Sequence, residues 1–246
     1  MAGSLSRPLV TSEPALPGLA PKKAEEPHYK KHRERLRDRF LTEPDALPDY
    51  ELLELLLTVI PQKDVKPLAK QLIEEFGGFA EVLAQPAETL QRVKGISATT
   101  AAYLKTVEVA AQRILKAKVI DRPVISSWDA LLDYCTAAMA RRPKEQFRLL
   151  FLDRKNVLIA DELQQEGTVD HTPLYPREVV RRALELNASA LIMVHNHPSG
   201  DPTPSKADIE MTRAVRDTLR PLGITLHDHL VIGRRGHTSF KSVGLL

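Results

Sequence analysis

A chain of 246 residues with 43% hydrophobic residues is long enough to form one large domain or two smaller ones around packed cores. The formal net charge of +3 is compatible with nucleic-acid contact but does not by itself indicate it. The single cysteine, Cys135, excludes an internal disulfide and any zinc site built from several thiolates. It also favours a reducing compartment.

Residues 1–27 contain five prolines and little apolar periodicity, so we expect them to form a disordered leader. They lack the apolar core of a signal peptide, and no apolar run in the chain reaches membrane-spanning length. We therefore expect a cytoplasmic protein that makes no membrane contact.

Residues 28–117 are expected to form an all-helical N-terminal domain. It opens on a charged stretch, "KKHRERLRDRF", whose pattern favours a solvated helix face over a nucleic-acid contact. A helix is predicted to begin near Asp64 and to stop at Gly77 and Gly78. A short helix, a tight turn at Gly95 and a long helix from Ser97 follow.

The pattern changes near residues 117–124, and residues 124–246 predict a second, mixed domain. The fold class is therefore α/β (α+β), with a helical half before a half built on a sheet. The run "SALIMV" is wholly apolar, as expected for a strand buried on both faces. The other elements predicted in this second domain are a helix at 128–140, two strands in "EQFRLLFLDRKNVLIADEL", helices in "PREVVRRALEL" and "SKADIEMTRAVRDTLRPLG", and a strand in "ITLHDHLVIG".

The segment "LIMVHNHPSGDPTPSKAD" places chemistry-bearing residues at the end of that apolar strand. Residues two apart in a strand share a face, so His195 and His197 present their imidazoles together. After a Pro/Gly-rich turn, Ser205 opens a helix and Asp208 lies in its first turn. Two imidazoles and one carboxylate with a fourth position open are typical of a catalytic zinc ion.

Helix capping is the alternative interpretation, because Ser205 and Asp208 also have the spacing of a capping box. Capping does not explain why two histidines share a strand face, so the metal site is favoured. The same ligand types also suit Fe(II) oxygenases, and metal-dependent nucleases must be considered. A nucleobase deaminase is disfavoured because its P-C-x-x-C zinc ligands are missing.

The spacing H-x-H, seven residues, Ser, two residues, Asp resembles the signature of the JAMM (JAB/MPN) metalloproteases. With "GTVDHTPLYPREVVRRALEL" upstream and "LHDHLVIG" downstream, residues 33–246 resemble the bacterial RadC family. The resemblance implies a JAB/MPN-type domain with zinc on His195, His197 and Asp208. It also implies that Ser205 lies near the reacting carbonyl.

JAMM enzymes use a glutamate on an earlier strand as general base, and Glu162 in "LIADELQQEGT" matches it best. It is expected at the end of the second predicted strand. Glu166 is the competitor, expected in a turn beside Gly167. Glu178 lies in the first turn of a predicted helix, where the helix dipole explains a carboxylate.

Three further features leave alternatives open. His227 and His229 are expected to share a strand face around Asp228, as partners that orient metal ligands or as core or surface residues. Cys135 is expected to be a buried, inert thiol. The segment "LQRVKGISATTAAYL" resembles a helix-hairpin-helix, with Ser97 where a second glycine is common, and either a phosphate cradle or a scaffold fits it.

Together these features predict a zinc-dependent JAMM-type hydrolase that cleaves a peptide or isopeptide bond in a peptide or protein substrate. The alternative is a DNA-repair or recombination accessory factor that binds DNA through residues 40–118. The sequence does not identify the substrate.

Overall fold

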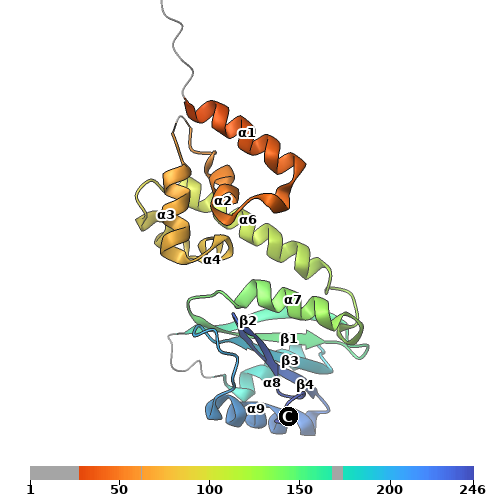
Figure 1. The fold of residues 1–246 in the computed structure, drawn as a ribbon. Helices are drawn as coiled ribbons and strands as arrows, with labels where there is room; N and C mark the ends of the chain where they lie inside the picture. Colours follow the sequence, from red (N-terminus) through yellow and green to blue (C-terminus); the bar gives the residue numbers. More distant parts are fainter. Residues whose placement is uncertain (1–27, 62, 168–173) are drawn as a thin grey trace, which may run out of the picture.

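The structure, a computed structural model, describes residues 28–61, 63–167 and 174–246. The expected leader, residues 1–27, lies outside the described residues. A helical half precedes a half built on one mixed sheet (Figure 1), which confirms the fold class predicted from the sequence. Within the described ranges, no helix is both long and apolar enough to cross a membrane.

The helical half packs around a cluster of leucines that includes Leu53, Leu72 and Leu104. Gly77 adopts φ 102° and ends the third helix, as its position in the sequence predicted. Ser97 caps the sixth helix by accepting a hydrogen bond from Thr100 N. The helices are α1 (His28–Thr42), α2 (Asp49–Leu57), α3 (Lys66–Phe76), α4 (Phe79–Ala84), α5 (Ala87–Arg92) and α6 (Ala98–Ala117), with a 3-10 turn, η1 (Pro44–Ala46).

The charged helix α1 is more than a solvated face, because two of its basic residues lie against acidic residues of α2. His32 Nε2 lies 2.8 Å from Glu54 Oε1, and Arg39 Nη1 lies 2.8 Å from Glu51 Oε2. The Glu54 side chain is only 1% exposed. A buried carboxylate needs such a partner, so these contacts dock α1 on α2.

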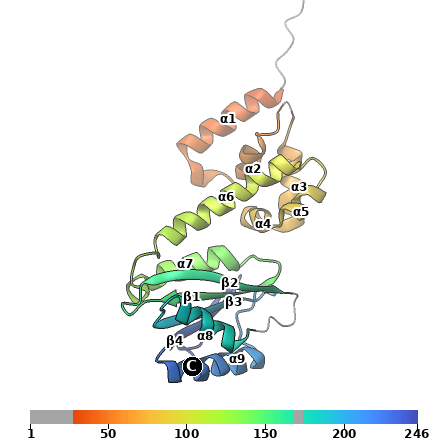
Figure 2. The same ribbon diagram turned by 180° about the vertical axis from the view of Figure 1, so that it is seen from behind.

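The second half is a five-stranded sheet in the order β2-β1-β3-β4-β5, with β3 and β4 parallel and the other neighbours antiparallel. Helix α7 covers one face, and α8 and α9 cover the other (Figures 1 and 2). The short strand β5, which pairs with β4, was not anticipated from the sequence. The elements are η2 (Val124–Ser127), α7 (Trp128–Met139), β1 (Glu145–Leu152), β2 (Leu158–Gly167), α8 (Pro176–Glu185), β3 (Ala190–Asn196), α9 (Lys206–Leu219), η3 (Arg220–Leu222), β4 (Thr225–Gly233) and β5 (Gly236–Ser239).

Strand β3 is buried along its whole length, as "SALIMV" predicted. Ile192 and Val194 pack into the cluster beneath α7, whereas Leu191 and Met193 pack into the cluster beneath α8 and α9. Cys135 lies in the α7 cluster, where burial raises the pKa of its thiol to about 12. The expectation that the thiol is buried is thus confirmed, and a raised pKa is what an inert thiol would have.

A buried carboxylate connects the two halves. Asp161 of β2 accepts hydrogen bonds from Arg148 Nε of β1 at 2.9 Å and from Lys116 Nζ of α6 at 3.2 Å. The Tyr134 hydroxyl of α7 donates a short hydrogen bond to the same carboxylate. Burial alone would raise the pKa of Asp161, but hydrogen bonds from Arg148 and Tyr134 and the charges of Arg148 and Lys116 outweigh it and lower the pKa.

We expect Asp161→Asn to lower the free energy of unfolding by about 3 kcal/mol at pH 7, because Arg148 loses its buried counter-charge. Since the folded-state pKa of Asp161 is lowered, its contribution is present above the unfolded-state pKa of about 3.9 and is lost as the pH falls through the folded value. The free energy of unfolding of the wild type and of Asp161→Asn is measured with urea. The difference between the two should be smaller at about pH 3 than at pH 7. Asp217→Asn is the control, because the Asp217 side chain is exposed. Equal free energies of unfolding for Asp161→Asn and Asp217→Asn at pH 7 would contradict the prediction.

Candidate metal centre

The end of β3 is held by Asn196, which lies between the two histidines and faces away from them. Its side-chain Oδ1 accepts a hydrogen bond from Gln146 N at 2.8 Å, and its Nδ2 donates to Lys144 O at 3.2 Å. These bonds tie the end of β3 to the beginning of β1. No role for Asn196 was predicted from the sequence, because its partners lie some fifty residues away.

The loop after the histidines is anchored against the turn between β4 and β5. Gly200 has φ 86°, and its carbonyl oxygen accepts a hydrogen bond from Arg235 N at 3.2 Å. A Cβ on Gly233 would lie 2.5 Å from that same oxygen, so only glycine allows this approach. This packing fixes the path by which the chain returns from β3 to α9.

The first turn of α9 forms the capping box that the sequence suggested. Asp208 N donates to Ser205 Oγ at 3.1 Å, and Ser205 N donates to Asp208 Oδ2 at 2.7 Å. The Ser205 hydroxyl also donates to Asp208 Oδ2 at 2.7 Å. Ser205 therefore uses its one proton to orient the Asp208 carboxylate, whose Oδ1 is turned towards His195.

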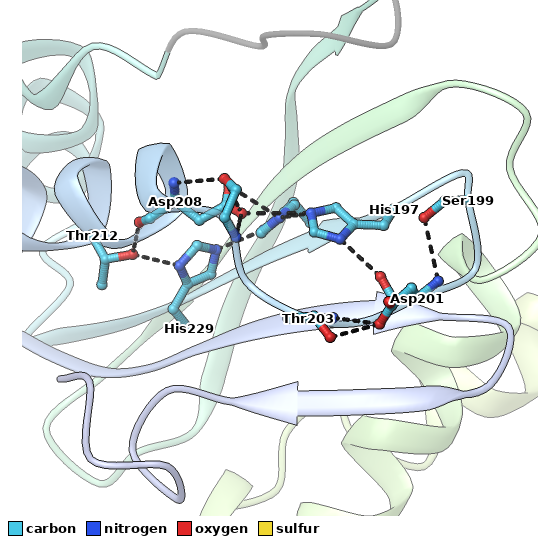
Figure 3. Close-up of polar contacts among 9 residues, drawn as sticks. His197, Ser199, Asp201, Thr203, Asp208, Thr212 and His229 are labelled. Atoms are coloured by element: carbon cyan, nitrogen blue, oxygen red, sulfur yellow. Dashed lines mark hydrogen bonds and ion pairs between the residues drawn. The ribbon is translucent and has the colours of Figure 1, made fainter.

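The structure brings His195, His197 and Asp208 together, with one ligand atom from each residue within 4.8 Å of the others. His195 Nε2 lies 3.0 Å from His197 Nε2 and 3.3 Å from Asp208 Oδ1, and His197 Nε2 lies 3.5 Å from Asp208 Oδ2. Figure 3 shows His197 and Asp208 pointing towards one another. Ligands held about 2.0–2.1 Å from a tetrahedral zinc ion lie about 3.3 Å apart, so these three residues fit zinc.

The electrostatics of the cluster also fit a cation. His197 Nδ1 donates to the carbonyl oxygen of Asp201 at 2.9 Å, which leaves Nε2 with its lone pair. The Asp208 carboxylate beside Nε2 favours positive charge at this position and raises the pKa of His197. Burial would raise the pKa of Asp208, but its contacts with both histidines and Ser205 hold it well below its usual range.

Glu162 lies in the middle of β2 and not at its end, because the strand continues to Gly167. It pairs with Leu149 of β1, and His195 pairs with Phe147, two residues along the same strand. Glu162 therefore faces the same side of the sheet as His195. Its carboxylate accepts hydrogen bonds from Arg182 Nε at 2.9 Å, and the structure does not place it in contact with the triad.

The two competing glutamates are placed elsewhere. Glu166 belongs to β2 and not to a turn, and it pairs with Gln146. Its neighbour Gln165 pairs with Phe147, so Glu166 points to the face opposite His195 and is exposed. Glu178 lies in the first turn of α8, as predicted, and accepts a hydrogen bond from Arg181.

The expectation that His227 and His229 share a strand face is wrong. The register of β4 against β3 shifts between Leu226 and Asp228, so His227 is an extra residue in a bulge. His227 contacts Asn156 and lines a cavity on the α7 side together with Asp228. His229 faces the other side, where its Nε2 lies 2.8 Å from His195 Nδ1, and burial lowers its pKa well below the ordinary value.

Comparison with known proteins identifies the family. Residues 125–245 match the RadC-like JAB domain. The chain is 62% identical to a UPF0758 protein of Rhodobacter capsulatus over 213 residues, which covers 86% of this chain and 100% of that relative. It is 60% identical to a UPF0758 protein of Ruegeria pomeroyi over 221 residues, which covers 89% of this chain and 99% of that relative. The chain therefore belongs to the RadC family of UPF0758 proteins, as the segments around His195 and His197 suggested.

Proposed function

We propose that this protein is a zinc-dependent hydrolase of the JAMM type that cleaves a peptide or isopeptide bond. The observation that carries the proposal is the convergence of two imidazole nitrogens and one carboxylate oxygen at the end of β3. The His197 side chain is 19% exposed, so the cluster is open to solvent on one side. The match to a JAB domain, a family that includes metal-dependent hydrolases, supports the same reading.

In the proposed site, His195 and His197 would hold zinc through Nε2 and Asp208 through a carboxylate oxygen. Bound zinc supplies Lewis acidity, which lowers the pKa of a coordinated water and stabilises a developing oxyanion. Glu162 is the proton acceptor that we assign, and it must first leave Arg182. Ser205 would donate to the substrate carbonyl only after its hydroxyl turns away from Asp208.

The proposal is tested on full-length protein purified without added metal. Elemental analysis should find about one zinc per chain, since the cluster offers one set of ligands. A mixture of linear and lysine-linked isopeptides is then incubated with the protein, and new amino termini are identified by mass spectrometry. Cleavage that stops with a chelator and returns with zinc supports the proposal. Absence of zinc, or cleavage indifferent to the chelator, contradicts it.

A second candidate function, DNA binding through residues 40–118, is favoured by one observation. The turn between α5 and α6 contains Gly95 at φ 108°, and a Cβ there would lie 3.0 Å from Lys63 Nζ. A lysine amine thus lies beside the start of α6, where a phosphate would bind. The assignment of this turn to a helix-hairpin-helix stays a prediction. If the full chain binds duplex DNA with an affinity that falls steeply as salt rises, the result would support this candidate function. No binding at low salt would contradict it.

A further inference from the structure

His229 connects the metal-ligand cluster to α9 through a chain of buried hydrogen bonds. The residue lies on β4 and is fully buried, and Figure 3 shows its ring beside Thr212. Its Nε2 lies 2.8 Å from His195 Nδ1, and its Nδ1 lies 2.6 Å from Thr212 Oγ1. Thr212 Oγ1 also lies 2.5 Å from the carbonyl oxygen of Asp208.

The direction of each hydrogen bond follows from the number of protons available. A carbonyl oxygen only accepts, so Thr212 must donate its single hydroxyl proton to Asp208 O. If Thr212 donated that proton to His229 instead, Thr212 Oγ1 and Asp208 O would lie 2.5 Å apart with no proton between them, and the two oxygens would repel each other. Thr212 Oγ1 therefore accepts, and the proton in its contact with His229 belongs to His229 Nδ1.

The same logic passes through His229 to the metal ligand. The imidazole of His229 is buried and forms no hydrogen bond or ion pair with a carboxylate among the described residues, since the bond to Asp228 comes from the main-chain N, so the ring is neutral. With its proton on Nδ1, its Nε2 can only accept, and His195 Nδ1 must donate. His195 then has no proton on Nε2, the atom that faces His197 and Asp208.

We infer that Thr212 and His229 are positioning residues that fix the tautomer and the ring orientation of His195, so that its Nε2 lone pair is directed at the metal position. The inference rests on the proposed metal site and goes beyond it, because neither residue is a ligand. The chain of hydrogen bonds begins at the carbonyl oxygen of Asp208 and ends at the ring of His195, which lies beside the Asp208 carboxylate. One turn of α9 thus supplies one ligand and orients another.

Aromatic packing keeps both rings in these orientations. The ring of Phe147 stacks on His195 with a centroid separation of 5.6 Å and an interplanar angle of 5°. The ring of Phe240 lies 4.5 Å from that of His229. A flipped His195 ring would lose the acceptor that its Nδ1 meets among the described residues, His229 Nε2.

The test measures zinc affinity of the full chain by competition with a chromophoric chelator. His229→Phe suits a pocket already lined by phenylalanines and removes the acceptor, so zinc affinity should fall about 10–100-fold. Thr212→Val keeps the shape but removes the hydroxyl, and affinity should fall about tenfold. Thr212→Ser restores a hydroxyl and should bind zinc within about twofold of the wild type.

Two results would overturn the inference. The first is Thr212→Val binding zinc as tightly as Thr212→Ser, a comparison that decides the matter even if His229→Phe fails to fold. The second comes from long-range ¹H–¹⁵N correlation spectra of zinc-loaded wild type, which should show protons on Nδ1 of both His195 and His229. A proton on His229 Nε2 would mean that His229 donates to His195 Nδ1, opposite to the inferred direction of that hydrogen bond. Failure of the wild type to bind zinc would instead overturn the proposed function, and the inference with it.

Discussion

Replacing both His195 and His197 by alanine is expected to abolish zinc binding. The double variant keeps only Asp208, and a single carboxylate already hydrogen-bonded to Ser205 cannot hold zinc at micromolar concentration. Each single alanine variant should already lose the metal during purification, because one imidazole and one carboxylate remain. Elemental analysis after gel filtration measures the zinc content of each protein.

His227→Ala is the matched control for these variants. His227 is a histidine of the same domain that faces the α7 side and contacts Asn156, so its removal should leave one zinc per chain. Thermal unfolding monitored by circular dichroism establishes that each variant is folded before its metal content is compared. Full zinc occupancy in the double variant would show that the metal is held elsewhere and would end the assignment of the site.

Glu162→Gln is expected to lower the rate of hydrolysis by about 10²–10⁴-fold while leaving the zinc content unchanged. Glutamine has nearly the same shape as glutamate but cannot accept a proton, and Glu162 is not one of the clustered ligands. Its place on β2, on the same face as His195, is the structural reason for choosing it. The rate is measured with the isopeptide substrate that the cleavage screen identifies.

Glu166→Gln is the control, since Glu166 lies on the same strand but points to the opposite face of the sheet. Its rate should stay within about twofold of the wild type. If Glu166→Gln loses activity and Glu162→Gln does not, the wrong base has been assigned. If Glu162→Gln loses zinc together with activity, Glu162 acts in metal binding and not as the proton acceptor.

The sequence by itself determined most of the elements, though not the short strand β5, and the local geometry of the site. Apolar runs and their boundaries depend on neighbours in the chain, which is why β3, α9 and the turn at Gly95 were predicted correctly. His195 and His197 belong to one strand end, and Ser205 and Asp208 to one helix turn. Side chains so close in sequence meet through backbone periodicity and a single short loop, so their convergence could be expected in advance.

Only the tertiary structure decided which distant groups meet these residues. A β-bulge in β4 separates His227 from His229, and the strand's residue pattern alone does not reveal the extra residue. The ion pair of Glu162 with Arg182 depends on how α8 lies across the sheet. The bond from His195 to His229 depends on the parallel register of β3 and β4. Pairing between strands is fixed by the packing of both sheet faces, a property of the whole domain that no local sequence pattern contains.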